Sequence, residues 1–186
     1  MFRVDHVFGH TYYLTNFCKL NKLTLASNDT KMIRHILHTF DQNRKNILAL
    51  LEEHTLEQVN TIPPGFNNNI IWNAGHLLLS QQFLLYHFSD LPMLDFVQEY
   101  TPKYGSGTIP DGGAAQSELD LIMDTLDSST KKVIDDYNSG LFKTYNAYTS
   151  EYFGITVQNI EEAIYFNTYH EGFHFGFMSA LKTALR

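Results

Sequence analysis

Four segments of the chain repeat apolar residues at the spacing of an α-helix, and this pattern constrains the fold more than any other feature. Two segments span about residues 31–54 and 68–88, and the other two begin near Ser117 and Asn159. The segment 68–88 is apolar nearly all round, so we expect its helix to be buried on most sides. Four helices joined by links of alternating length predict an all-α fold, a four-helix bundle with one long crossover loop at residues 89–116.

The sequence around these segments is consistent with their predicted ends. The asparagines at 67–69 and Asn159 have side chains suited to capping the N-terminus of a helix. The crossover at 89–116 holds three prolines and several glycines, which favour a loop. Residues 141–157 are aromatic and irregular, and we expect short extended segments there.

Length and composition indicate a single folded domain. A chain of 186 residues with 44% apolar and 18% charged residues can bury a sizeable core. Residues 1–30 show no clear helical or strand period. We therefore predict that residues 1–30 are a poorly patterned N-terminal extension and that residues 31–186 form the bundle.

The charge and the cysteine count exclude several classes of protein. The formal net charge is -7 and no basic stripe is visible, which argues against binding to nucleic acid. No apolar run reaches 18 residues, so the sequence predicts no membrane span. The single cysteine, Cys18, cannot form an intrachain disulfide, and we expect a reducing, cytoplasmic location.

Three of the nine histidines predict a metal site. His170 and His174 lie four residues apart on the last helix, so both imidazoles project from one face and can reach one ion. His76 lies among apolar residues of the second helix, where an unpaired imidazole is costly to bury. The plainer interpretation of His76 is a core histidine bonded to a neighbour. Three imidazoles with an open fourth position are typical of a catalytic metal ion.

Two better-known motifs overlap the His170–His174 segment, and neither fits. His170-Glu171-x-x-His174 matches the zinc-protease motif, but no third ligand follows in the twelve remaining residues. Glu171-x-x-His174 matches half of a di-metal carboxylate site, but no second copy exists. The six other histidines are expected in the extension, on polar faces, at a helix end or too far along the second helix: His6, His10, His35, His38, His54 and His87.

Residues near the three histidines are candidates to support them. A ligating histidine usually donates its other ring nitrogen to a carboxylate, carbonyl or water. Asn73 and Asn167 each lie three residues before a proposed ligand, and Glu171 lies beside one. An ordinary role on the helix surface or in capping is the alternative for each of them. Arg44 interrupts an apolar face, so it either reaches a pocket or extends to water.

The combined motifs resemble a known family. Trp72-Asn73-Ala74-Gly75-His76 on the second helix, Phe166-Asn167-Thr168-Tyr169-His170 on the last helix and the following His174 resemble the DinB-like (YfiT-like) superfamily of metalloenzymes over about residues 31–186. The resemblance implies an up-down-down-up order of helices and a homodimer. It implies a divalent metal ion, zinc, nickel or iron, held by His76, His170 and His174. It also implies a small-molecule substrate, in characterised members a low-molecular-weight thiol.

Two functional hypotheses follow. The first is a metal-dependent enzyme in which the three-histidine site activates a thiol or a water, that is, a thiol S-transferase or a hydrolase. The catalytic residues beyond the metal ligands are not assigned. The second is a non-enzymatic bundle with a structural or adventitious metal ion. An open cleft beside the histidines favours the first hypothesis, and a fourth protein ligand favours the second.

Overall fold

A computed structural model describes the backbone of residues 10–185 and the side chains of residues 31–185. The chain divides into two compact units, residues 1–35 and 36–186, and the features below belong to the second. The boundary predicted between residues 30 and 31 lies close to this division. Helix α1 (His10–Glu52) begins well before Lys31, so the prediction placed the start of this helix too late.

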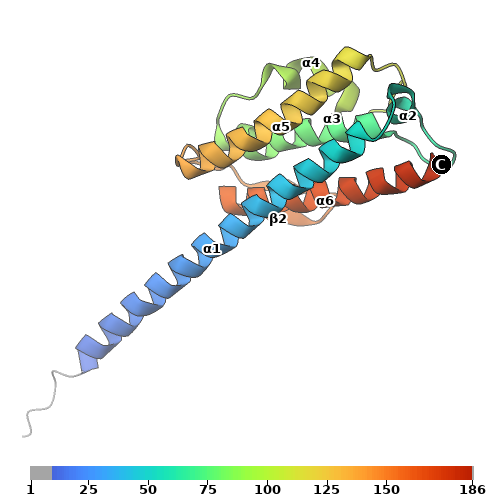
Figure 1. The fold of residues 1–186 in the computed structure, drawn as a ribbon. Coiled ribbons are helices and arrows are strands. Elements are labelled where there is room, and N and C mark those ends of the chain that lie inside the picture. The colour runs from blue at the N-terminus through green and yellow to red at the C-terminus, as the bar shows by residue number, and fades with distance from the viewer. Residues whose placement is uncertain (1–9, 186) are drawn as a thin grey trace, which may run out of the picture. The chain divides into compact units, whose positions relative to one another are not determined.

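The residue 36–186 unit contains a four-helix bundle, as the periodicity predicts. Its long helices are the Ile36–Glu52 part of α1, α3 (Ile70–Gln81), α5 (Gln116–Asn138) and α6 (Ile160–Ala184). In Figure 1, α1 and α6 run in one direction and α3 and α5 in the other, which is the up-down-down-up order. The short α2 (Leu56–Asn60) lies between α1 and α3. The all-α fold is therefore confirmed.

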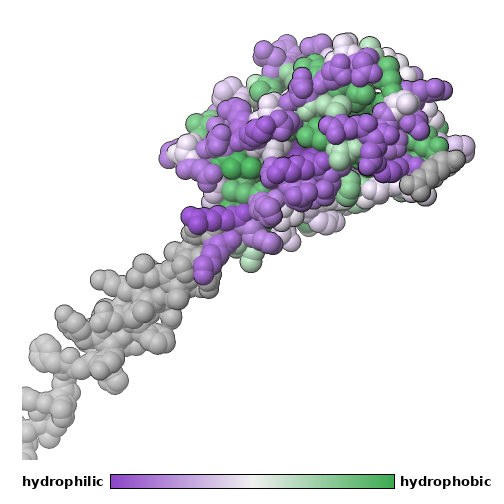
Figure 2. Space-filling view, in the orientation of Figure 1, coloured by the Kyte–Doolittle hydropathy of each residue, from purple (hydrophilic) through white to green (hydrophobic). Residues whose placement is uncertain are grey.

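Helix α3 is the central element of the bundle. It packs against α4, α5 and α6, and ten of its twelve residues are buried. A π-helical turn (Gln82–Tyr86) and a 3-10 turn (His87–Ser89) continue it, so the segment ends close to the predicted Phe88. Figure 2 shows that hydrophilic residues cover much of the visible outer face of the bundle, with smaller apolar patches between them.

The predicted N-caps are present. The side chain of Asn69 accepts a hydrogen bond from the backbone N–H of Trp72 at 2.9 Å. The side chain of Asn159 accepts one from the backbone N–H of Glu162 at 2.9 Å. Each bond satisfies one of the backbone donors that a helix start leaves unpaired.

The crossover between α3 and α5 is not a simple loop. It contains α4 (Asp95–Tyr104), so the expectation of a continuous loop is wrong there. Phe96, Val97 and Tyr104 are buried, and their packing against α3 stabilises the helix despite Pro102 in its last turn. The prolines and glycines of the crossover are local loop signals, and this tertiary packing overrides them.

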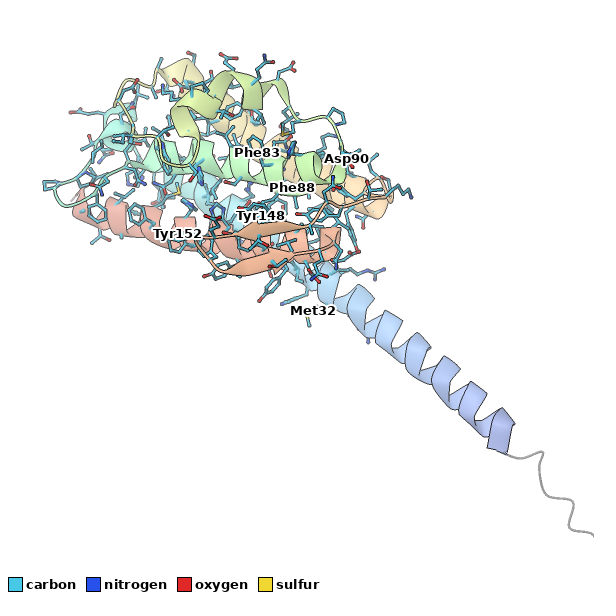
Figure 3. All side chains as sticks on the ribbon, turned by 180° about the vertical axis from the view of Figure 1, so that it is seen from behind. Met32, Phe83, Phe88, Asp90, Tyr148 and Tyr152 are labelled. Carbon is cyan, nitrogen blue, oxygen red and sulfur yellow. The ribbon has the colours of Figure 1, made fainter. Side chains whose placement is uncertain are left out.

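A small hairpin fills the predicted extended region. Strands β1 (Tyr148–Ser150) and β2 (Ile155–Val157) are antiparallel, with Tyr148 opposite Val157. Gly154 takes a φ of +64° in the turn, a conformation that glycine adopts without strain. In Figure 3 the labelled Tyr148 and Tyr152 of the hairpin lie along the same side of the bundle as Phe83 and Phe88.

Among the described helices, none is both long enough and apolar enough to cross a bilayer.

Candidate metal centre

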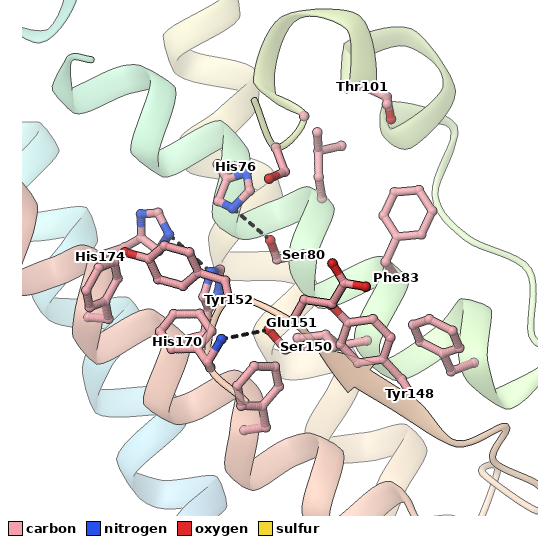
Figure 4. Close-up of a pocket in the computed structure, with 18 of the residues that line it drawn as sticks. His76, Ser80, Phe83, Thr101, Tyr148, Ser150, Glu151, Tyr152, His170 and His174 are labelled. Atoms are coloured by element: carbon pink, nitrogen blue, oxygen red, sulfur yellow. Dashed lines mark hydrogen bonds between the residues drawn. The ribbon is translucent and has the colours of Figure 1, made fainter. Parts of the chain in front are cut away.

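The three predicted histidines meet between α3 and α6. His76 comes from α3, and His170 and His174 come from successive turns of α6. One ring nitrogen of each lies within 4.8 Å of the other two, and the Nε2 atoms of His170 and His174 are 3.1 Å apart. The structure thus brings together the three residues selected from the sequence, as Figure 4 shows.

The motif residues around His76 explain how its ring is oriented. Nδ1 of His76 lies 2.9 Å from the backbone carbonyl of Tyr104, to which it donates. Nε2 therefore keeps its lone pair, and the hydroxyl of Ser80 lies 3.2 Å from it. The indole of Trp72 stacks on the imidazole with a centroid separation of 4.9 Å and an interplanar angle of 6°. The ring is thus held by hydrogen bonds to Tyr104 and Ser80 and by one stacked neighbour.

Gly75 makes the contact between His76 and α4 possible. A Cβ atom at position 75 would lie 2.5 Å from the ring of Tyr104, closer than real Cβ contacts come. Tyr104 is itself fixed, because its hydroxyl donates to Glu118 of α5 at 2.5 Å. The glycine of the Trp72–His76 motif is therefore required by the packing of α4, which supplies the carbonyl to His76.

Asn73, selected because it lies three residues before His76, instead orients His174 of α6. Nδ1 of His174 donates to Oδ1 of Asn73 at 2.7 Å. The amide NH₂ of Asn73 donates to the backbone carbonyl of Asn69 at 2.7 Å, which fixes which end of the amide faces His174. Nε2 of His174 is thereby left as an acceptor that faces His170. This is the arrangement by which a neighbouring group sets the tautomer of a ligating histidine.

His170 leaves one buried polar atom unpaired. Its Nδ1 is buried and has no hydrogen-bond partner among the described residues, and only 8% of His170 is exposed. The ring of Phe153 stands at 87° to it, with centroids 5.9 Å apart. Buried polar atoms without a partner are uncommon, and a bound ion or water is one explanation for them.

The His170–His174 pair has the nitrogen separation of two ligands on one divalent metal ion. Two nitrogens bound to one ion at about 2.0–2.1 Å lie about 2.9–3.4 Å apart for bond angles between octahedral and tetrahedral values, and the His170–His174 pair is at 3.1 Å. All three nitrogens lie within 4.8 Å of one another. Two nitrogens bound to the same ion can be at most about 4.2 Å apart, twice the length of one bond. An imidazole whose nitrogen is 4.8 Å from another must therefore move by about half an ångström or more to bind the same ion.

Burial keeps the three imidazoles in the neutral form that binds metals. It lowers the pKa of His170 to about 4, with a smaller contribution from the neighbouring His76. It lowers the pKa of His174 to about 2, with contributions from His170 and His76. Burial also lowers the pKa of His76, against the opposing hydrogen bond to Tyr104. Neutral nitrogens with lone pairs are the required form of a histidine ligand.

The histidines lie at the wall of a cleft of about 960 Å³. The cleft runs between α3, α6 and the β1–β2 hairpin, and its lining is rich in aromatic rings. We call six of these residues the aromatic wall: Phe83, Phe88, Tyr148, Tyr152, Phe153 and Phe173. A cleft of this size beside the nitrogens gives a small molecule room to approach a bound ion.

Asn167 and Glu171, the two other supporting candidates, do not contact the histidines through hydrogen bonds. Glu171 forms a buried ion pair with Arg44 at 2.5 Å, with their side chains 0% and 1% exposed. The amide of Asn167 donates to the same carboxylate at 3.0 Å, and Gln81 accepts from Arg44 at 2.8 Å. Burial raises the pKa of Glu171, and Arg44 and Asn167 oppose that rise. Both residues thus belong to a polar cluster inside the bundle, as does Arg44, which does not extend to water.

This cluster also bears on the zinc-protease motif. A general base in that motif must face the metal ion, whereas Glu171 is held by Arg44 on the side of α6 that faces α1. A carboxylate paired with an arginine in this way is not available to take a proton from a substrate water. The geometry therefore agrees with the rejection of the protease interpretation.

Several site residues carry no signal that sequence reasoning recognised. Tyr104 acts through its backbone carbonyl, which any residue has. Ser80 lies one helical turn after His76, and that spacing could have identified it. Phe153 and the hairpin come from a segment without regular period. Of the other histidines, His35, His38, His54 and His87 do not join the cluster, and the side chains of His6 and His10 lie outside the described residues.

The fold and the histidine cluster define an all-α bundle with a candidate metal site. A family model described as the DinB superfamily matches residues 39–178. The chain therefore belongs to the DinB superfamily, in agreement with the resemblance carried by its motifs. No curated protein matches the chain.

Proposed function

We propose that this chain is a metal-dependent enzyme, a thiol S-transferase or a hydrolase, with His76, His170 and His174 as the ligands of a divalent ion. The observation that carries the proposal is the convergence of three imidazole nitrogens at the wall of a cleft of about 960 Å³. Such an ion supplies Lewis acidity, which lowers the pKa of a thiol or a water. Zinc, nickel and iron all suit three imidazoles, and the donor set does not distinguish them.

The protein's own residues hold this site rigid and open. The carbonyl of Tyr104 fixes the ring of His76, and the amide of Asn73 fixes the ring of His174. The lining of the cleft adds no further histidine, cysteine or aspartate to the set, and its one carboxylate, Glu151, does not belong to the cluster of potential ligands among the described residues. Three ligands beside an open cleft are typical of catalytic rather than structural zinc sites.

Metal analysis of variants tests the proposed ligands. Protein purified without an affinity tag is expected to bind one divalent ion per chain, and His170→Ala is expected to lose stoichiometric binding, because two imidazoles alone make a weak site. His87→Ala removes an exposed histidine from the 3-10 turn that follows α3, outside the proposed ligand set, and serves as the control. Full metal occupancy in the His170→Ala protein would refute the site.

Activity assays then separate the enzymatic proposal from a metal-binding role alone. The metal-loaded protein is assayed for thiol transfer with several low-molecular-weight thiols and for hydrolysis of simple esters and amides. We expect turnover that disappears with chelation and in the His170→Ala variant. A homodimer and a cytoplasmic location remain predictions, tested by light scattering in solution and by cell fractionation.

A further inference from the structure

The charge in the lining of the cleft is negative only. Glu151, in the turn of the hairpin, is the only charged side chain among the described residues that line it, and no lysine or arginine does so. Glu151 is exposed, and in Figure 4 its carboxylate points into the cleft on the side of Phe83. Nothing in the described lining offers a positive charge to the acidic group of a ligand.

Two basic residues around the cleft, Arg44 and Lys103, are already paired. Arg44, behind His170 on the far side of α6, is neutralised by Glu171 at 2.5 Å. Lys103, close to the cleft residues Thr101 and Gly105 in sequence, is paired with Glu118 at 2.7 Å. Neither charge is free to bind an anionic ligand, and the whole chain carries a formal net charge of -7.

The aromatic wall favours a ligand with a positive charge. Phe88 lies against Tyr148 with ring centroids 4.8 Å apart, and Phe153 lies against Phe173 at 5.6 Å. Such rings take flat apolar groups by burial of surface and by stacking. The faces of aromatic rings are also electronegative, so they attract a cation and repel an anion.

We propose that the cleft binds an aromatic, apolar molecule that carries a positive charge, of the arylalkylamine class. The apolar body lies against the aromatic wall, and the ammonium group lies near the carboxylate of Glu151. This inference rests on the proposed function, for which it gives the substrate class. It also implies that a thiol with several carboxylates is a poor ligand of this cleft.

A matched series of ligands tests the charge preference. The probes 4-phenylbutylamine, 4-phenylbutanol and 4-phenylbutyrate share one aromatic body and differ in the charge of the head group. Their affinities are measured by calorimetry on zinc-loaded protein and on protein treated with a chelator. Because a carboxylate can bind zinc directly, the order in the metal-free protein decides the preference. We expect the amine to bind about tenfold more tightly than the acid there, with the alcohol in between.

Three variants locate the residues responsible for the preference. Glu151→Gln is expected to weaken binding of the amine by about three- to fivefold, since the carboxylate is exposed to solvent, and to leave binding of the alcohol unchanged. Glu57→Gln removes the same charge from an exposed position on α2 and is expected to change neither affinity. Phe83→Ala removes part of the aromatic wall and is expected to weaken the binding of all three probes.

Three results would overturn the proposal: the acid binding as tightly as the amine without metal, no saturable binding of any probe, or an unchanged affinity for the amine in Glu151→Gln. Metal content is measured on the same samples. If the histidines hold no ion, the proposed function fails, while the order of the three probes is still determined. The two failures are therefore distinguishable.

Discussion

At the scale of single residues, the segment Trp72–His76 assembles most of the support for the histidine cluster. Trp72 stacks on His76, and Asn73 accepts from His174. Gly75 leaves room for Tyr104, whose carbonyl accepts from His76. A motif that first suggested only one metal ligand therefore also holds the orienting partner of a second, which lies on another helix.

The role of Asn73 can be tested through metal affinity. Asn73→Leu removes the acceptor for Nδ1 of His174, so we expect a loss of about 10- to 100-fold in zinc affinity, the usual effect of losing such a partner. Asn73→Asp keeps the acceptor but loses the donor to the carbonyl of Asn69, so it should bind zinc more tightly than Asn73→Leu and less tightly than the parent protein. Competition with a chromophoric chelator measures both affinities.

Asn138→Leu at the exposed end of α5 is the control for the same change of side chain away from the site. Circular dichroism establishes that each variant is folded. An unchanged zinc affinity in Asn73→Leu would show that the orientation of His174 does not depend on this hydrogen bond.

At the scale of elements, the site depends on two segments that the bundle pattern does not contain. Helix α4 supplies the carbonyl to His76, and the hairpin supplies part of the aromatic wall. Phe153 of the hairpin contacts Phe166, Tyr169 and Phe173 of α6, with ring centroids 5.5–5.7 Å apart. The bundle helices carry the histidines, and these two connecting segments shape the cleft around them.

The close approach of α3 and α4 predicts the effect of Gly75→Ala. The new methyl group meets the ring of Tyr104, which cannot retreat because its hydroxyl is bound to Glu118. We expect a loss of about 1–3 kcal/mol in the free energy of unfolding, typical of an overpacked interior, together with weaker zinc binding. Urea denaturation measures the first effect and chelator competition the second.

Gly172→Ala on α6 is the matched control, because no atom lies within 4 Å of a Cβ added there. Replacing glycine by alanine inside an open helix face is expected to stabilise it, by up to about 1 kcal/mol. Equal stabilities of the Gly75→Ala and Gly172→Ala variants would contradict the packing argument.

At the scale of the whole residue 36–186 unit, a buried polar cluster connects three helices that lie far apart in the sequence. Arg44 of α1 contacts Glu171 of α6 and Gln81 of α3, and Asn167 of α6 completes the cluster. Charged groups that are fully buried need such partners, because a lone buried charge is costly. The cluster therefore disfavours any register of α1 and α6 that separates Arg44 from Glu171.

Removal of one partner should destabilise the protein more than removal of both. Arg44→Met leaves the carboxylate of Glu171 buried without its partner, and we expect a loss of about 3–5 kcal/mol in the free energy of unfolding. The double variant Arg44→Met, Glu171→Met replaces the pair by apolar groups and should recover most of that loss.

Chemical denaturation of the parent, the two single variants and the double variant completes the cycle. The exposed pair Lys131–Asp127 gives the matched comparison, and Lys131→Met is expected to change the stability by less than about 1 kcal/mol. If the double variant is as unstable as the sum of the single variants, the two side chains do not act as a pair.

The sequence by itself determined the local features of this protein. Periodicity located the four bundle helices, and asparagines marked the start of α3 and of α6. Spacing selected His170 and His174, and apolar neighbours selected His76. Each of these signals is local or repeats within one helix, where a residue's direction follows from its position in the turn. Asn73 was selected because it lies one turn before His76 on the same helix, but its actual partner, His174 on α6, was not predicted.

Only the tertiary structure decided which groups from different elements meet. The helix α4 within the crossover, the carbonyl of Tyr104 at His76, the ion pair of Arg44 with Glu171 and the hairpin over His170 all depend on contacts between distant parts of the chain. A backbone carbonyl has no sequence signature, and an arginine on an apolar face does not indicate its partner. These features follow from packing, which periodicity alone does not encode.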